Sequence, residues 1–286
     1  MMRDEILKIL TEKSDLPPLP EILLKLQNLI NDPESELEEI ARLIETEPVL
    51  SGRLIKLANS VLYGGGREKT EDLSGTVMRL GVKMILDLAY TLQLTNMFNR
   101  FKSFDQYKFW MHSMAVACLT QTLSQKVNLP QEEKEESYVC GLMHDLGIVV
   151  FEYLIPDEYF AFVKSIGPEE ASLETLELEK FGIAHPELGA RFIRQNWPIS
   201  PIVITAVENH FHPLSVNGAG LNVSQLVGIA NQVAINEGIT NGIGIPPEIP
   251  LEGKIYEKLG ISPEELEEIV ETTVEGLDNT ELLMKA

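Results

Sequence analysis

Residues 137–151, SYVCGLMHDLGIVVF, form an almost uninterrupted apolar run with His144 and Asp145 side by side at its centre. A helix that is apolar on every side is normally buried. An ionisable pair inside such a helix costs free energy unless it is hydrogen-bonded, ion-paired or bound to a metal. Gly141 and Gly147 flank the pair, so a neighbouring helix can approach it closely. The stretch therefore predicts one buried helix with a polar site at its centre.

Two interpretations of the His144–Asp145 pair are open. In the first, the histidine is a structural core residue that donates a hydrogen bond to its neighbour's carboxylate or to a backbone carbonyl. In the second, the imidazole and the carboxylate are ligands of a divalent transition metal, which both groups suit. The pair alone favours the structural interpretation.

The rest of the chain shows helical spacing of apolar residues, interrupted by proline and glycine, and no convincing alternating strand pattern. Helix starts are signalled at Glu21 after LPPLP, at Ser35 with Glu38 as a capping box, at Asp72 or Ser74, and at Ser262 with Glu265. The predicted fold class is all-α, with two helical lobes. We expect three segments: an N-terminal helical lobe over 1–104, a second helical lobe over 105–237, and a loop with acidic helices over 238–286.

Composition narrows the function classes. The net charge of the 286 residues is −21, and most of the excess negative charge follows residue 104. General nucleic-acid binding needs a basic surface, so we expect no nucleic-acid partner. No apolar stretch is long enough to span a bilayer and the first residues do not resemble a signal peptide, so we expect a cytoplasmic protein without a membrane partner. Cys118 and Cys140 lie in apolar sequence and are expected to be buried free thiols.

All five histidines lie after residue 110, on what the spacing predicts to be four helices or helix ends. Helical bundles build metal sites from side chains that several helices direct toward one point. The clustering favours the metal interpretation of the pair over the structural one. A structural alternative remains for three of them, because His210 and His212 could interact with a helix dipole and His185 could be a surface residue at a helix start. The five are His112, His144, His185, His210 and His212.

Several separated motifs, in order, resemble the HDOD family of bacterial signalling proteins over roughly residues 14–215. That family belongs to the HD superfamily of metal-dependent phosphohydrolases and is similar to the HD-GYP cyclic di-GMP phosphodiesterases. The motifs are LPPLP at 16–20, IETEPVLSGRLIKLANSVLYG at 44–64, MRLGVKMILDLA at 78–89, WMHS at 110–113, GLMHDLG at 141–147 and HPELGARFI at 185–193. The resemblance implies that an HDOD-specific helical lobe precedes a degenerate HD-type helical lobe.

The resemblance also implies a site. His112, His144 and Asp145 match the first three metal ligands of an HD hydrolase, and His185 and His210 match further histidines of HD-GYP enzymes. The counterpart of the distal aspartate ligand is Asn231, which is neutral.

Two further positions depart from HD-GYP enzymes. Ile148 stands where those enzymes have a lysine, and there is no GYP tripeptide. These departures remove charged groups that position and activate a phosphodiester, while most of the metal ligands remain. We therefore expect a metal site for iron, manganese or zinc at His112, His144, Asp145, His185, His210 and Asn231.

The predicted function is a non-catalytic regulatory module of bacterial signal transduction that binds a partner protein or a nucleotide-type ligand. The alternative is a metal-dependent phosphohydrolase acting on a nucleotide or cyclic dinucleotide, with a metal that activates water for in-line attack. Asn231 and Ile148 distinguish the two, because the sequence shows no substitute for the charges that are missing there.

Overall fold

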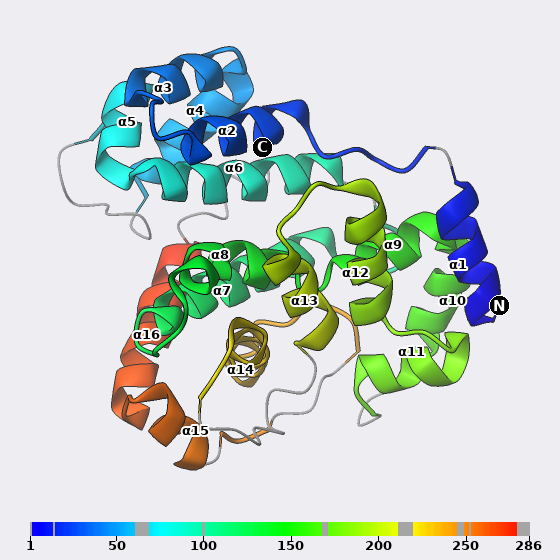
Figure 1. Ribbon diagram of the computed structural model, residues 1–286. Helices are drawn as coiled ribbons and strands as arrows, with labels where there is room; N and C mark the ends of the chain where they lie inside the picture. Colours follow the sequence, from blue (N-terminus) through cyan, green and yellow to red (C-terminus); the bar gives the residue numbers. More distant parts are fainter. Residues whose placement is uncertain are drawn as a thin grey trace. The chain divides into compact units, whose positions relative to one another are not determined.

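The computed structural model describes residues 2–13, 15–60, 69–98, 101–167, 171–210, 220–244, 249–251 and 253–278. Within these ranges every regular element is a helix and no strand occurs, which confirms the all-α prediction (Figure 1). The chain divides into two compact units, of which the first comprises residues 1–17 and 98–270, and the second residues 18–97 and 271–286. The division into 1–104, 105–237 and 238–286 stays a prediction.

The second unit is built from five consecutive helices whose apolar faces pack together. They are α2 (Glu21–Asn31), α3 (Leu37–Glu45), α4 (Pro48–Ala58), α5 (Leu73–Leu80) and α6 (Val82–Met97). The helix α6 packs against α2, α4 and α5, and ten of its residues are buried, so it is the central element of this unit. Gly81, with φ 78°, makes the sharp turn from α5 to α6.

Local signals set most helix starts in this unit. The side chain of Asp72 accepts a hydrogen bond from the backbone of Gly75, which selects Asp72 over Ser74 as the cap of α5. The cap predicted at Ser35 with Glu38 is wrong by one residue, because Glu36 and Glu39 form the capping box of α3. Both pairs have the same spacing, and α3 buries Ile40, Ala41 and Ile44.

The first unit holds the remaining helices. These are α1 (Arg3–Glu12), α7 (Gln106–Ser124), α8 (Gln131–Met143), α9 (Leu146–Leu154), α10 (Pro156–Ser165), α11 (Leu173–Phe181), α12 (His185–Asn196), α13 (Pro201–Asn209), α14 (Val223–Asn236), α15 (Gly253–Leu259) and α16 (Pro263–Asp278), the last of which runs past the end of the unit at Val270. The helix α7 packs against α8 and α14, α9 packs against α12, and α13 contacts α8, α12 and α14. As expected, Cys118 and Cys140 are buried and neither forms a disulfide within the described residues.

Two glycines let helices approach around the His144–Asp145 pair. A Cβ on Gly141 would collide with the backbone of Val116 and Ala117 in α7, and a Cβ on Gly147 would collide with the backbone of His185 in α12. The close approach expected at both glycines is therefore confirmed. It brings α7 and α12, which both carry histidines, directly against the α8–α9 segment.

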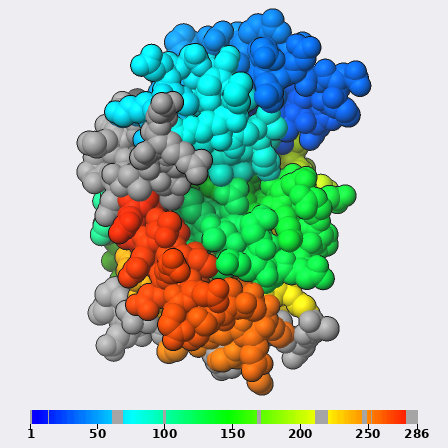
Figure 2. Space-filling view, turned by 90° about the vertical axis from the view of Figure 1, so that its left-hand side faces the viewer, coloured from blue at the N-terminus to red at the C-terminus, as the bar shows by residue number. Residues whose placement is uncertain are grey.

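The acidic end of the chain forms surface helices. The predicted cap of α16 is confirmed, since Ser262 N donates to Glu265 Oε2 and Glu265 N donates to Ser262 Oγ. Leu266 and Val270 are buried while the glutamates between them are exposed, and α15 and the first part of α16 lie on the surface (Figure 2).

Across the described parts of the chain, no single helix has both the length and the apolar character needed to cross a membrane. One sharply bent pair of segments, 131–154 followed by 156–165, meets the criteria of length and composition only.

Candidate metal centre

The His144–Asp145 pair lies at a break between two helices. We predicted one continuous helix through the pair, but α8 ends at Met143 and α9 begins at Leu146. His144 keeps helical dihedral angles, whereas Asp145 has φ −93° and ψ 10° and departs from them. Both residues are buried: His144 is 0% exposed and Asp145 is 2% exposed. The break therefore places an imidazole and a carboxylate together inside the apolar run, as predicted.

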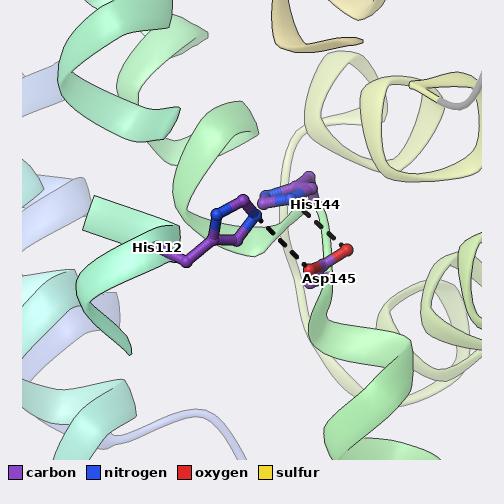
Figure 3. A group of neighbouring side chains, drawn as sticks. All are labelled: His112, His144 and Asp145. Carbon is purple, nitrogen blue, oxygen red and sulfur yellow. Dashed lines mark ion pairs between the residues drawn. The ribbon is translucent and has the colours of Figure 1, made fainter. Parts of the chain in front are cut away.

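His112 approaches Asp145 from the middle of α7 (Figure 3). Its Nε2 atom lies 3.7 Å from Asp145 Oδ2, while the Nε2 atom of His144 lies 3.3 Å from Asp145 Oδ1. The rings of His112 and His144 are neighbours, with centroids 5.2 Å apart.

His185 and His210 reach the same carboxylate from helix ends. His185 is the first residue of α12, and its Nε2 atom is 3.3 Å from Asp145 Oδ1. His210 directly follows α13, and its Nε2 atom is 3.9 Å from the same oxygen. Both residues are 1% exposed, so His185 is not the surface residue that the alternative interpretation described. Four imidazoles from four parts of the first unit thus surround Asp145.

The Nδ1 atoms of three of these histidines are held by backbone carbonyls. His144 Nδ1 lies 2.8 Å from Gly141 O, His210 Nδ1 lies 2.9 Å from Val207 O, and His112 Nδ1 lies 2.8 Å from Ile239 O. A carbonyl can only accept, so each Nδ1 carries the proton and each Nε2 presents its lone pair. This is the arrangement in which histidines bind metals.

The fourth histidine has an acidic partner that the sequence did not suggest. Glu177 Oε2, in α11, accepts hydrogen bonds from His185 Nδ1 at 2.8 Å and from His185 N at 2.7 Å. A second buried acid of α11, Glu174, has Oε1 3.8 Å from His185 Nε2. Neither glutamate stands in a motif, and their helical spacing is equally typical of a solvent-exposed face, so no sequence signal marked them.

Two asparagines lie beside the cluster, one at Asp145 and one at His112. Asn241, another residue that sequence reasoning missed, donates from Nδ2 to Asp145 Oδ2 over 2.8 Å. Asn231, in α14, lies close enough to His112 to influence its pKa. The buried Oδ1 atom of Asn231 has no hydrogen-bond partner among the residues that the structure describes.

The pKa values of His112 and His210 are shifted in the opposite direction to that of His185. Burial lowers the pKa of His112 to about 4 and that of His210 to about 3, and the neighbouring His144 adds to both shifts. Burial also opposes protonation of His185, but the carboxylates of Glu177 and Asp145 outweigh it and raise its pKa well above the usual value. Burial alone would raise the pKa of Asp145, yet His144 and His185 lower it well below its usual range. Asp145 is thus an anion facing two neutral imidazoles at neutral pH.

The donor set fits a metal ion. The Nε2 atoms of all four histidines are buried and, within the described ranges, none has a hydrogen-bond partner. His112, His144 and Asp145 form one group of possible ligands, and Asp145, His185 and His210 form another, with ligand atoms inside each group within 4.8 Å of one another. Orphaned buried acceptors are costly, and a cation would satisfy them. The cluster can therefore bind a metal.

Most of the predicted ligand set comes together in this structure. His112, His144, Asp145, His185 and His210 converge, with Asn231 beside them, whereas His212 lies outside the described residues. Their convergence is a finding, and their role as ligands stays a prediction.

Residues 16–213 match the HDOD domain family. An uncharacterized protein of Treponema pallidum is 27% identical over 196 residues, which are 68% of this chain and 37% of that protein. The cyclic di-GMP phosphodiesterase PA4108 of Pseudomonas aeruginosa is 27% identical over 128 residues, which are 44% of this chain and 27% of that enzyme. The chain thus spans only about a third of the length of these relatives.

Solved structures share the fold. An HDOD domain protein of unknown function from Geobacter sulfurreducens superimposes with a TM-score of 0.73 at 22% identity, covering 98% of this chain and 92% of its own. A protein from Shewanella amazonensis, provisionally named a phosphohydrolase, superimposes with a TM-score of 0.70 at 22% identity, covering 96% of this chain and 97% of its own. These likenesses confirm the helical HDOD architecture.

Proposed function

Because this chain belongs to the HDOD domain family, we propose that it is a regulatory module of bacterial signal transduction that holds a metal ion and does not catalyse hydrolysis. Its output is contact with a partner protein or a nucleotide-type ligand, and its compartment is the cytoplasm. The metal is a structural component in this proposal. It is bound by His112, His144, Asp145, His185 and His210, and its charge stabilises the buried carboxylate of Asp145 and the buried Nε2 lone pairs of His112, His144 and His210.

The observation that carries this proposal is the closure of the cluster around Asp145. All five donor residues are at most 2% exposed, and the amide of Asn241 donates to Oδ2 of the carboxylate. A phosphodiesterase must admit a bulky anionic substrate beside its metal and leave a ligand position for water. A buried, hydrogen-bonded carboxylate matches a closed structural site better.

The ligand chemistry favours a first-row transition metal. Four imidazole nitrogens and one carboxylate are typical ligands of iron, manganese or zinc, whereas Mg²⁺ and Ca²⁺ prefer oxygen ligands. The neutral Asn231 at the predicted distal position offers only a carbonyl oxygen, which weakens the site for a hard cation. We therefore expect iron, manganese or zinc, and no dependence on magnesium.

The alternative function is a metal-dependent phosphohydrolase acting on a nucleotide or a cyclic dinucleotide. The similarity of 128 residues to a cyclic di-GMP phosphodiesterase of Pseudomonas aeruginosa favours it. Ile148 and Asn231 argue against it, because both replace residues that the resemblance to HD-GYP enzymes would require to be charged.

The deciding experiment combines metal analysis with an activity assay. The untagged protein and a His144→Ala variant are purified, and their iron, manganese and zinc contents are measured by inductively coupled plasma mass spectrometry. Each is then reconstituted with these metals and incubated with cyclic di-GMP and bis-p-nitrophenyl phosphate. We expect bound metal in the parent protein, loss of metal in the variant, and no hydrolysis by either. Hydrolysis by the parent that is lost in the variant would establish the phosphohydrolase instead.

A second variant tests whether the missing charges at positions 148 and 231 explain the absence of hydrolysis. The double substitution Asn231→Asp with Ile148→Lys introduces the charges that the resemblance identifies as missing. Hydrolysis gained only by this variant supports loss of catalysis in the present chain. Absence of metal from the parent protein, even after reconstitution, would contradict the metal part of the proposal.

A further inference from the structure

His185 is held differently from the other three histidines of the cluster. The Nδ1 atoms of His112, His144 and His210 each meet a neutral backbone carbonyl, whereas His185 Nδ1 meets the carboxylate of Glu177 at 2.8 Å. Glu177 is 0% exposed. A buried carboxylate is costly unless its oxygens are satisfied, so its position beside one imidazole needs an explanation.

Glu177 is satisfied by donors on both of its oxygens. Its Oε2 atom accepts from the backbone N of His185 at 2.7 Å and from His185 Nδ1, while its Oε1 atom accepts from the Tyr159 hydroxyl at 2.8 Å. Glu177 Oε2 thus accepts hydrogen bonds from both the backbone and the ring of His185, which fixes the orientation of the ring relative to α12. The Tyr159 hydroxyl, from α10, in turn fixes the carboxylate.

The chain between α11 and α12 is built to bring these two residues together. Ser172 caps the start of α11, and Gly182 ends it in the left-handed conformation with φ 72°. Only Ile183 and Ala184 then precede His185 at the start of α12, so the chain turns back within a few residues. The result is that Glu177, in the last turns of α11, faces the first turn of α12.

A carboxylate partner does more for an imidazole than a carbonyl does. It holds the proton on Nδ1, directs the lone pair of Nε2, and raises the basicity of the ring toward a metal. Resting on the metal site proposed above, we propose that Glu177 is a positioning residue that orients His185 and strengthens it as a metal ligand. The other three histidines have no comparable acid at Nδ1, so the effect of Glu177 is specific to His185.

The competing explanation is that Glu177 only caps α12, because it accepts the His185 backbone N–H at a helix start. The substitution Glu177→Gln separates the two roles. Glutamine has the same shape and its carbonyl oxygen can still accept from His185 N and Nδ1, so a capping role survives. The negative charge at Nδ1 does not survive.

Glu152→Gln is the matched control. Glu152 is another buried acid of the first unit, 6% exposed, and it accepts from Lys102 N at 2.6 Å and from the Ser103 hydroxyl without contacting a histidine. Its substitution removes a buried charge and tests general destabilisation. Tyr159→Phe removes only the donor to Glu177 Oε1 and gives an intermediate case.

The test measures zinc affinity and the cobalt spectrum of the full chain. Zinc dissociation constants are obtained by competition with a chromophoric chelator for the parent protein and for the Glu177→Gln, Tyr159→Phe and Glu152→Gln variants. The Co²⁺ forms are compared by visible absorption, and the thermal unfolding of each metal-free form is recorded. We expect Glu177→Gln to bind zinc about 10- to 100-fold more weakly, with a changed Co²⁺ spectrum. Tyr159→Phe should weaken binding less, and Glu152→Gln should leave the affinity and spectrum of the parent unchanged.

Two results would overturn the inference alone. In the first, the parent binds zinc and Glu177→Gln binds it equally well. In the second, Glu177→Gln and Glu152→Gln lose affinity together, in proportion to lost stability. If the parent binds neither zinc nor Co²⁺, the proposed metal site fails and this inference fails with it.

Discussion

Asn241 donates a hydrogen bond to the carboxylate of Asp145, 96 positions earlier in the chain, with 2.8 Å between Nδ2 and Oδ2. The same segment supplies Ile239 O, which accepts from His112 Nδ1. The segment that follows α14 is therefore part of the cluster, although its glycines and polar residues gave it the appearance of a plain loop. Two hydrogen bonds, one to the Asp145 carboxylate and one to the His112 imidazole, hold the segment that contains Ile239 and Asn241 against the cluster.

Replacing Asn241 with alanine should lower the free energy of unfolding of the metal-free protein by about 1.5–3 kcal/mol, because a buried charged acceptor loses its amide donor. Urea unfolding followed by circular dichroism measures this. Asn209→Ala is the control, since Asn209 donates the same kind of amide hydrogen bond, to Thr205 O, at an exposed position of α13. Equal losses for the two variants would show that the Asn241 contact has no special role.

Replacing Gly147 with alanine should destabilise the first unit by about 1–3 kcal/mol or more, since the added methyl group collides with the backbone of His185 and Gly189. It should also separate His185 from Asp145 and weaken metal binding. Gly52→Ala is the opposite case. A Cβ added to Gly52, within α4, would meet no atom within 4 Å, so alanine there should stabilise by about 0.5–1 kcal/mol. Thermal unfolding of both variants checks the contrast.

Replacing Asp145 with alanine should cost the metal-free protein about 3–5 kcal/mol, as expected when one partner of a buried charged network is removed. His185, whose pKa is raised, then loses one of its nearby carboxylates, and Asn241 loses its acceptor. Denaturant unfolding in the presence of a chelator gives the value. An unchanged midpoint would mean that the carboxylate is solvated and not buried.

The metal-free protein should lose stability as the pH falls below about 6.5. His112 and His210 have native pKa values of about 4 and about 3, against 6.5 for the unfolded chain. Between these values the unfolded state binds protons that the native state does not, so each histidine lowers the stability by about 2 kcal/mol at pH 5.

His185 and Asp145, the other two proposed ligands with shifted pKa values, do not reverse this trend. His185 has a raised pKa and is protonated in both states below pH 6.5, so its contribution is lost only as the pH rises. The pKa of Asp145 is lowered, and its contribution is lost only below its unfolded value near 3.8. Urea midpoints at pH 7, 6 and 5 with a chelator present measure the slope, and His210→Gln should remove about half of it. A flat profile would contradict the neutral, buried state of both rings.

Much of the fold was readable from the chain because helix signals are local. Proline and capping residues set helix starts at Glu21, Asp72 and Ser262, and glycines marked the close helix contacts at Gly141 and Gly147. The histidine cluster was predicted from the positions of the histidines after residue 110 and from the family resemblance.

The features that the sequence did not predict include two residues, Glu177 and Asn241, that reach the cluster through tertiary contacts. Glu177 and Asn241 carry no local signal, since a glutamate in a helix and an asparagine in a glycine-rich segment are ordinary surface residues. The interruption at Asp145 was missed because the apolar run continues unchanged through it, and the one-residue error at Ser35 arose because two overlapping pairs fit the same capping pattern.

The four imidazoles differ in how far along the chain their Nδ1 partners lie. His144 and His210 are each held by a carbonyl three residues earlier, so a single helical turn is enough to orient these rings. His112 needs Ile239, 127 positions away, and His185 needs Glu177 across the turn between two helices. During folding, the rings of His144 and His210 can therefore be oriented early, whereas His185 must wait until α11 and α12 pack together and His112 until the chain beyond α14 has docked. A metal ion would thus bind with its full ligand set only after the first unit has folded, and its binding would stabilise that folded state.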